Sequence, residues 1–257
     1  MTGSYSRTRV VCLDEVDSTN SEAMRRAMGG ACEPLWIMAE RQTSGRGRSG
    51  RVWDGGSGNL TASLLLPLKG GLANAARLSL VAGVAVVESV KALNGGATVP
   101  GVFLKWPNDV LIGGAKLGGV LIESSQAEGR SYAIIGVGLN LATAPHIYGR
   151  RATTLREAIK RDVSPEAALA ALDIAFSRWA IGEKWQGETG FHEVRSAWCA
   201  ASLPTGTEMS VHTQSGLVQG RFSGLDENGW LLLTIQDGSM GKFNFGEVCL
   251  ASETEMS

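Results

Sequence analysis

The sequence predicts a mixed α/β domain followed by a small all-β module, on the basis of three observations. Runs typical of strands alternate with runs of helical periodicity through roughly the first 200 residues. After Pro204 the runs are short, β-like and separated by turn residues. The chain has 257 residues, which suits one medium domain with a small appendage. We therefore expect one domain over residues 1–203 and a second over residues 204–257.

The first elements are two strands, at residues 10–16 and 35–40, with a helix between them. Thr19 and Glu22 have the spacing of a capping box, so the helix is expected to begin there. The stretch over residues 45–59 holds six glycines and three arginines in fifteen residues, which excludes the interior of a regular helix or strand. An apolar run at residues 60–66 then suits a buried strand.

The middle of the chain alternates between the two element types. Residues 72–93 have the length and pattern of a long, mostly buried helix. Further strands are expected at residues 102–106, 109–112, 117–124 and 132–139, and further helices at 153–160, 165–185 and 191–198. Pro165 suits the first turn of its helix, directly behind Ser164.

The last fifty or so residues read as a small β module, near the lower size limit for a free-standing core. Its strands are expected at residues 208–212, 217–225, 230–235 and 242–249. Residues 226–229, Asp-Glu-Asn-Gly, form a turn signal between two of them.

Composition excludes several classes of protein. The chain is 44% hydrophobic and 19% charged, so it should fold rather than be disordered. Its 24 basic and 25 acidic residues argue against a wholly basic nucleic-acid surface, although a local basic patch stays open. Four dispersed cysteines and three histidines lack metal or disulfide spacing, which favours free, buried thiols. Without a signal-peptide core or a bilayer-length apolar stretch, a cytoplasmic protein without membrane contact is expected.

The segment Gly45-Arg46-Gly47-Arg48-Ser49-Gly50-Arg51 carries the strongest chemical signal. Glycines allow a backbone to approach a ligand closely, and interleaved arginines can bind phosphate or carboxylate through paired hydrogen bonds. The alternative is a solvated, RNA-binding arginine-glycine element. Trp53 and a buried-type strand just beyond favour a loop tethered over a folded site.

Three further motifs follow this loop. Lys105-Trp106-Pro107-Asn108-Asp109 can direct Asn108 and Asp109 to one locus, although Pro-Asn-Asp is also ordinary turn chemistry. Lys116 precedes the double glycine Gly118-Gly119, where it is either a point charge beside a close backbone approach or a solvated hairpin lysine. Residues 136–140, Gly-Val-Gly-Leu-Asn, lack the third glycine of a dinucleotide fingerprint, and the chain has no P-loop.

Each motif is weak alone, but their order and spacing together resemble the biotin–protein ligase family. The segments that carry the resemblance are Asp17-Ser18-Thr19-Asn20, Glu40-Arg41-Gln42 with the loop up to Trp53, residues 105–109, residues 116–123 and residues 136–140. The resemblance extends from about residue 10 to the end of the chain, more loosely after Leu141.

The resemblance implies a catalytic domain like those of class II aminoacyl-tRNA synthetases and lipoate ligases, with a mixed sheet and a following SH3-like barrel. It implies a non-repressor type without an N-terminal DNA-binding domain, because the chain starts almost at the first catalytic strand. The substrates would be ATP and biotin, with Mg²⁺, and the partner a biotin carboxyl carrier domain of acetyl-CoA carboxylase or a related carboxylase. No nucleic-acid partner is implied, and a homodimer is left open.

The resemblance also assigns roles to individual residues. Lys116 would bridge the biotin carboxylate and the α-phosphate, while Arg46 and Arg48 close over the intermediate and act on both substrates. Trp53 would pack under that loop on the nucleotide side. The remaining biotin contacts would be Ser18, Thr19, Asn20, Gln42, Gly45, Gly47, Gly119 and Gly136. Asn108 and Asn140 would bind the nucleotide and Asp109 the metal.

Two departures and two alternatives accompany this interpretation. Arg151-Ala152-Thr153, which directly precede Thr154-Leu155-Arg156-Glu157-Ala158, contain no aromatic residue, whereas many bacterial relatives have a tryptophan there that covers the adenine. Ala251 stands where some relatives carry a late arginine. The nearest alternative is a lipoate–protein ligase on the same fold, against which the arginine-glycine loop and the Ser18-Thr19-Asn20 trio argue. A non-enzymatic RNA-binding protein is the alternative from a different class, and the near-neutral charge counts against it.

Overall fold

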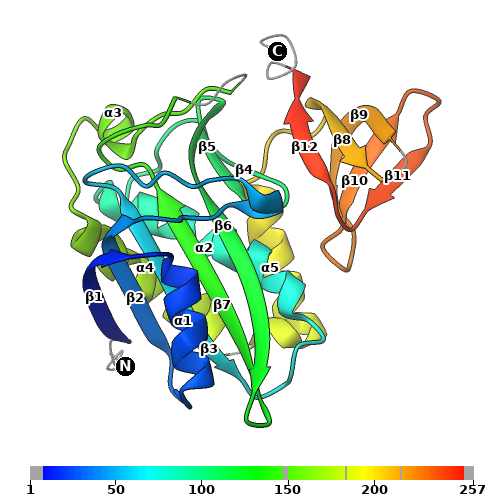
Figure 1. Ribbon diagram of the computed structural model, residues 1–257. Coiled ribbons are helices and arrows are strands. Elements are labelled where there is room, and N and C mark those ends of the chain that lie inside the picture. The colour runs from blue at the N-terminus through cyan, green and yellow to red at the C-terminus, as the bar shows by residue number, and fades with distance from the viewer. Residues whose placement is uncertain (1–7, 147–149, 183, 215, 252–257) are drawn as a thin grey trace.

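The computed structural model describes residues 8–146, 150–182, 184–214 and 216–251. Its main part is a seven-stranded sheet with the strand order β1-β2-β3-β7-β6-β5-β4 (Figure 1). The strands are β1 (Arg9–Val16), β2 (Leu35–Gln42), β3 (Leu60–Leu68), β4 (Val102–Lys105), β5 (Asp109–Ile112), β6 (Ala115–Ala127) and β7 (Arg130–Leu139). Only β1 and β2 pair in parallel among these neighbours, so the predicted mixed sheet is confirmed.

Helices cover both faces of this sheet, as Figure 1 shows. The helix α1 (Thr19–Met28) lies on one face, where Ala23 and Ala27 pack against apolar residues of β2, β3 and β7. The other face is covered by α2 (Leu78–Leu93), α4 (Pro165–Phe176) and α5 (Glu188–Ala200). Because α2 is apolar on nearly every side, it is buried between the sheet and the outer helices. The short α3 (Leu155–Ile159) begins at a capping box formed by Thr154 and Glu157.

The C-terminal module is a five-stranded antiparallel sheet with the order β11-β10-β9-β8-β12. Its strands are β8 (Glu208–Thr213), β9 (Gly216–Leu225), β10 (Leu231–Ile235), β11 (Met240–Phe243) and β12 (Glu247–Leu250). The single strand predicted over residues 242–249 is wrong, because Gly246 has a φ of 144° and turns the chain between β11 and β12. The two halves pair with different neighbours, β11 with β10 and β12 with β8.

The module packs directly on the domain that holds the seven-stranded sheet, and one cluster of buried apolar side chains runs through both. The rings of Trp198 on α5 and Phe222 on β9 meet edge to face with centroids 6.5 Å apart. The indole of Trp106 donates a 3.1 Å hydrogen bond to the Gly229 carbonyl in the β9–β10 turn. The predicted change from mixed α/β to all-β at Pro204 therefore coincides with a change of sheet but not with a break in the core.

Three further predicted elements differ from the structure. The Thr19–Glu22 capping box is absent, since Ser18 is the N-cap and the Thr19 hydroxyl instead donates to Gln42. The helix expected from residue 72 begins as a 3₁₀ turn at Ala75–Arg77, with α2 starting at Leu78. The helix expected over residues 165–185 is an α-helix to Phe176, continues as a π-helix over Ser177–Ile181 and ends there. Beyond it the indole of Trp185 donates a 3.0 Å hydrogen bond back to the Ala180 carbonyl.

The cysteines are free, as expected, but their predicted burial is wrong. Cys12, Cys32 and Cys199 are exposed and Cys249 is half-buried. Cys12 faces outward because β1 is an edge strand whose alternate residues, Val11 and Leu13, pack against the α1 side of the core. Among the described helices, none combines the length and apolar character that a membrane span requires.

Candidate functional site

The arginine-glycine segment folds into a closed loop between β2 and β3 that crosses the upper end of the sheet towards the C-terminal module (Figure 1). We call residues 45–53 the arginine loop. Its stem is closed by hydrogen bonds from Trp53 N to Gly45 O at 2.9 Å and from Gly47 N to Arg51 O at 2.7 Å. Gly45 is required by close approach, since a Cβ there would collide with the Trp53 carbonyl and the Gln42 amide. The segment is thus a built structure and not a solvated basic tail.

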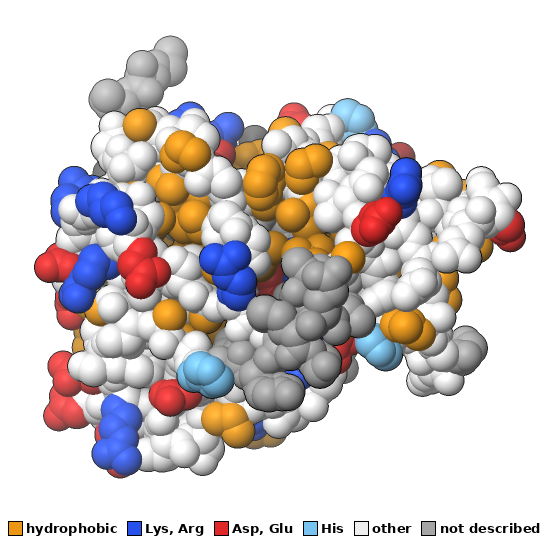
Figure 2. Space-filling view, turned by 90° about the horizontal axis from the view of Figure 1, so that it is seen from above, with side chains coloured by type: hydrophobic (Ala, Val, Ile, Leu, Met, Phe, Trp, Pro, Cys, Tyr) orange, Lys and Arg blue, Asp and Glu red, His pale blue; other side chains and the backbone are white. Residues whose placement is uncertain are grey.

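A pocket of about 500 Å³ lies under this loop. The loop, the 105–109 motif, the first residues of β6 and the C-terminal module all contribute to its wall. Eight of the predicted site residues line it, namely Gly47, Arg48, Trp53, Asn108, Asp109, Lys116, Gly119 and Gly136. Figure 2 shows this end of the molecule, where hydrophobic side chains gather between basic ones. The sequence motifs, separated by up to about ninety residues, therefore converge on one cavity.

The glycine pair on β7 has a clear steric reason. Gly136 and Gly138 are two residues apart, so they lie on one face of the strand. A Cβ on Gly138 would collide with the indole of Trp53, and a Cβ on Gly136 would collide with the Asn20 amide. The residues 136–138 therefore form a flat floor on which Trp53 and Asn20 rest side by side.

The positive charge of the pocket is centred on Lys116. Its ammonium lies 2.5 Å from Asp109 Oδ1, while Lys105 Nζ lies 3.4 Å from Asp109 Oδ2. Burial by itself would raise the pKa of Asp109, but the charges of Lys116 and Lys105 outweigh burial and hold that pKa below its usual range. A Cβ on Gly119 would lie 3.4 Å from Lys116 Nζ, so this glycine keeps the space beside the ammonium open.

These contacts bear on the expected magnesium role of Asp109. Magnesium takes six oxygen ligands, usually one or two carboxylates together with water and phosphate oxygens. Both oxygens of Asp109 already face a lysine ammonium, and the described residues contain no group of three side chains suited to a metal. The residues present do not fit a resident metal, so the metal contact of Asp109 stays a prediction and no step is assigned to it.

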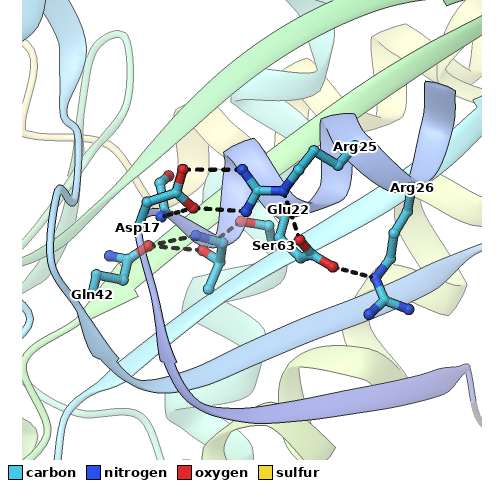
Figure 3. Close-up of polar contacts among 8 residues, drawn as sticks. Asp17, Glu22, Arg25, Arg26, Gln42 and Ser63 are labelled. Atoms are coloured by element: carbon cyan, nitrogen blue, oxygen red, sulfur yellow. Dashed lines mark hydrogen bonds and ion pairs between the residues drawn. The ribbon is translucent and has the colours of Figure 1, made fainter. Parts of the chain in front are cut away.

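A buried polar network adjoins the pocket floor (Figure 3). Gln42 Oε1 accepts hydrogen bonds from the backbone N and the hydroxyl of Thr19, at 2.8 and 3.1 Å. Ser63 Oγ lies 2.7 Å from Thr19 Oγ1 and 2.5 Å from Asn20 Oδ1, and its single proton serves one of them at a time. Thr19, Asn20 and Ser63 are each at most 4% exposed. This network presents donors and acceptors in fixed directions, which suits recognition of a small polar ring.

The start of α1 is held in place from the outside by an ion-pair chain. Asp17 accepts from Arg25 at 2.7 Å, and Glu22 accepts from both Arg25 and Arg26 at 2.8 Å (Figure 3). The hydrogen bond from Arg25 lowers the pKa of Asp17 to about 2. Asp17 also accepts from the backbone N of Ser18, so the chain orients the residues that enter the polar network.

Glu123 joins the polar network to the arginine loop. Its Oε2 accepts from the Asn20 amide at 2.7 Å, and its Oε1 lies 3.1 Å from Arg46 Nη2. The Asn20 side-chain amide donates to Glu123 through Nδ2 and accepts from the Ser63 hydroxyl through Oδ1, and these two bonds fix its orientation. Neither Ser63 nor Glu123 was among the predicted site residues. Ser63 carries the detectable signal, a hydroxyl inside the apolar run of β3.

Arg48 reaches across the pocket to two other parts of the chain. Its guanidinium donates to Asn108 Oδ1 at 3.2 Å and to the Gly246 carbonyl of the C-terminal module at 3.3 Å. Asn108 is itself fixed by a 2.7 Å bond to the Val120 carbonyl. Burial lowers the pKa of Arg48, an effect that Asp109 and Glu247 partly offset, so the guanidinium stays charged at neutral pH.

The remaining predicted residues do not line the pocket wall. Ser18, Thr19, Asn20, Gln42, Gly45 and Arg46 lie in the adjoining network and the loop stem. Asn140 is 1% exposed and donates a 3.3 Å hydrogen bond to the backbone carbonyl of Lys116. It thus supports the lysine from behind, and its nucleotide contact stays a prediction.

Sequence reasoning missed the contribution of the C-terminal module. Glu247 and Val248 line the pocket, together with Arg150 from the segment before α3. Glu247 accepts from Arg51 of the arginine loop and from Arg150. A single acidic residue at the start of a short strand carries no local signal for such a role, because its partners are about 100 and 200 residues away.

Comparisons with known proteins agree with this geometry. A model of the biotin/lipoate A/B protein ligase family matches residues 16–140. The chain is 36% identical to a biotin–[acetyl-CoA-carboxylase] ligase of Paracoccus denitrificans, over 86% of this chain and 92% of the relative. It is 32% identical to the Mycobacterium tuberculosis ligase of the same description, over 86% of this chain and 81% of that one. The structure is similar to a biotin protein ligase from Aquifex aeolicus in complex with biotin and ATP, with a TM-score of 0.77, 31% identity and coverage of 94% and 98%.

Proposed function

The chain belongs to the biotin–protein ligases, and on that premise we propose that it activates biotin with ATP and transfers it to a lysine of a biotin carboxyl carrier domain. The observation that carries the proposal is one continuous site. The fixed polar network around Thr19 and Asn20 meets the cationic pocket around Lys116 at Gly136. A ligand with a polar ring at one end and a carboxylate at the other suits such a site.

In the first step a biotin carboxylate oxygen attacks the α-phosphorus of ATP. The bond from that phosphorus to the bridging oxygen of the β-phosphate breaks, and pyrophosphate leaves with the electron pair. Negative charge grows on the phosphate oxygens, so cations fixed beforehand lower the barrier. Lys116 supplies this charge next to the carboxylate, with Arg48 also lining the pocket and Arg46 at the loop stem.

In the second step the acceptor lysine, as a free amine, attacks the carbonyl carbon of biotinyl-5′-AMP. An amide bond forms, the bond to the AMP oxygen breaks, and the amine loses a proton to solvent. The mixed anhydride must be kept from water until the acceptor arrives. The closed arginine loop with Trp53 against Gly138 covers the pocket for this purpose.

The proposed contacts follow the two halves of the site. Ser18, Thr19, Asn20, Gln42, Gly45, Gly47 and Gly119 serve biotin, together with Gly136. Trp53, Asn108 and Asn140 serve the nucleotide. Magnesium enters with the phosphates of ATP as part of the substrate. Asp109 could contact it only after its ion pair with Lys116 has opened. Because the reaction consumes ATP, we place it in the cytoplasm, and we assign the C-terminal module to the SH3-like type.

Two observations favour this function over the alternatives. The arginines of the loop each bond to the protein, Arg46 to Glu123, Arg48 to Asn108 and Arg51 to Glu247, which does not suit an RNA-binding arm that needs free cations. The relatives named above are biotin ligases, whereas the family model covers both biotin and lipoate enzymes.

The test is transfer to a carrier. The protein is incubated with ATP, magnesium, biotin and a biotin carboxyl carrier domain, and the domain is weighed by mass spectrometry. We expect the mass of one biotinyl group on the target lysine, none on a carrier with that lysine replaced by arginine, and none with lipoate. Modification by lipoate in preference to biotin, or no modification at all, would overturn the proposal.

A further inference from the structure

One turn of the C-terminal module reaches the arginine loop. It connects β11 to β12, and its last residue, Gly246, precedes Glu247, the first residue of β12. The Gly246 carbonyl accepts from Arg48 at 3.3 Å. The Glu247 carboxylate accepts from Arg51 and, at 2.6 Å, from Arg150. Two neighbouring residues of the module thus bind two arginines of the loop.

The module presents this turn rigidly. Gly246 has a φ of 144°, which side-chain-bearing residues rarely adopt, and a Cβ there would lie 3.1 Å from the His212 carbonyl. Beyond the turn, β12 is paired with β8 over its whole length, and Val248 and Leu250 are buried in the common core. The position of Glu247 is therefore fixed by the folding of both domains.

The loop end of the contact is rigid within itself but weakly tied to its surroundings. The Arg51 carbonyl closes the stem of the loop through Gly47 N, so movement of Arg51 moves the tip as a unit. The side chains of Arg51 and Glu247 are 50% and 34% exposed, and exposed ion pairs are weak and reversible. Such a contact can hold a loop closed and still release it on the time scale of catalysis.

The negative charge of Glu247 offsets the repulsion between arginines of the pocket. Arg48, Arg51 and Arg150 all line the pocket and repel one another, while Asp109 is already paired with two lysines. Glu247 is the carboxylate that bridges Arg51 and Arg150. The hydrogen bond from Arg51, opposed by burial and aided by Arg150, holds the pKa of Glu247 below its usual range, so it is ionised at neutral pH.

We propose that Glu247 is a positioning residue that latches the arginine loop closed, so that the C-terminal module sets how long biotinyl-5′-AMP is retained. The inference rests on the proposed function, since it concerns the intermediate of that reaction. Glu247 acts through its ion pair with Arg51, next to the bond from Arg48 to the Gly246 carbonyl, without touching the reacting atoms itself. The small module is then part of the active site's closure and not an appendage.

The test compares the full-length protein with Glu247→Gln, which keeps the shape of the side chain but removes its charge. The adenylate is formed from labelled biotin and ATP, free substrates are removed, and its release into excess unlabelled biotin is followed. We expect release about 3- to 10-fold faster in Glu247→Gln, the size typical of one or two partly exposed ion pairs. Glu208→Gln is the matched control, because it breaks an exposed ion pair with Arg221 within the same module.

A double-mutant cycle separates latching from a general loss of structure. If Glu247 acts through Arg51, the rate of adenylate release from Glu247→Gln/Arg51→Gln should equal that of the faster single variant. High salt should reduce the difference in release rate between Glu247→Gln and wild type. Additive effects of the two substitutions, or release from Glu247→Gln as slow as from wild type, would overturn the latch. Wild-type protein that forms no adenylate from biotin and ATP would instead overturn the proposed function.

Discussion

The carboxylate of Asp109 lies 2.5 Å from the ammonium of Lys116, so the lysine expected to meet the substrate is already held by an acidic partner in the pocket wall. Asp109 is buried and also faces Lys105, whose side chain is 2% exposed. Removing the carboxylate takes the acidic partner of these two ion pairs away from both lysines. Losing one partner of a buried ion pair costs about 3–5 kcal/mol.

Asp109→Asn should therefore lower the free energy of unfolding at pH 7 by roughly 3 kcal/mol, measured by urea denaturation. The pKa of Asp109 is lowered in the folded state, so its contribution is complete above the usual pKa of an aspartate and is lost as pH falls through the lower, folded-state pKa. The difference between wild type and Asp109→Asn should shrink below about pH 4. An equally stable variant at pH 7 would contradict the buried pair.

Lys116→Ala should nearly abolish adenylate formation. Losing one fixed charge at the reacting centre costs about 3–4 kcal/mol of barrier, or a 10²- to 10³-fold slower reaction. Pyrophosphate release with biotin and ATP measures this step. Lys91→Ala, an exposed lysine near the end of α2, is the control. A folded Lys116→Ala protein that releases pyrophosphate at the wild-type rate would exclude the role of Lys116 in activation.

Arg48→Gly should form the adenylate but lose it. The variant lacks both the charge near the phosphate and the bonds to Asn108 and Gly246, so the intermediate should escape and modify lysines of bystander proteins. Labelled biotin on serum albumin, at saturating biotin and ATP, is the readout. Arg41→Ala, which removes an exposed pair with Glu15, should leave albumin unlabelled. If Arg48→Gly only raises KM and labels no albumin, Arg48 contributes affinity rather than retention.

Gly138→Ala should displace Trp53 from the pocket floor. The added methyl would collide with the indole, and overpacking of this kind typically costs about 1–3 kcal/mol. We expect weaker binding of ATP by calorimetry, with biotin binding less affected because Asn20 rests on Gly136. Gly182→Ala is the control, since a Cβ there meets nothing within 4 Å. Unchanged ATP affinity in Gly138→Ala would show that Trp53 does not serve the nucleotide.

The arginine loop should be cut by trypsin in the free protein and protected by biotin with ATP. The loop is bonded to the rest of the protein largely through partly exposed arginines, Arg46 and Arg51 among them. Without a ligand, the free energy needed to open the loop is therefore small. An anion in the pocket adds bonds that only the closed loop can make. Equal cleavage with and without ligands, mapped by mass spectrometry, would count against closure on binding.

The sequence was informative where the structural cause is local. Periodicity predicted the seven strands of the main sheet, and glycine spacing predicted the loop, because both reflect backbone geometry over a few residues. Prediction from the sequence failed where a residue far away in the chain determines the local structure. Thr19 was predicted to cap its helix, yet its hydroxyl donates to Gln42. The helix predicted to residue 185 ends at Ile181, and Trp185 lies beyond that end, bonded back to the Ala180 carbonyl.

In the candidate site too, residues in local motifs were predictable and residues that act through distant partners were not. Lys116, Asp109 and Arg48 stand in recognisable motifs, and the structure brings them to one pocket. Glu123 and Glu247 matter through contacts with arginines that are 77 and 196 residues away, and no local pattern records such pairs. Gly136 and Gly138 looked like part of a nucleotide fingerprint, but the reason for them is the side chains that rest on them.

The apolar cluster that runs unbroken from the large sheet into the β module has a consequence for how this chain can change over generations. Trp198, Phe222 and Trp106 with Gly229 form a seam in which each side is shaped by the other. If the module were exchanged with that of a distant relative, the side chains at this interface would no longer fit one another. Packed interiors tolerate such changes in side-chain volume poorly. Shuffling of genes at this boundary should therefore be selected against, and the two parts should be inherited and diverge together, each compensating for substitutions in the other.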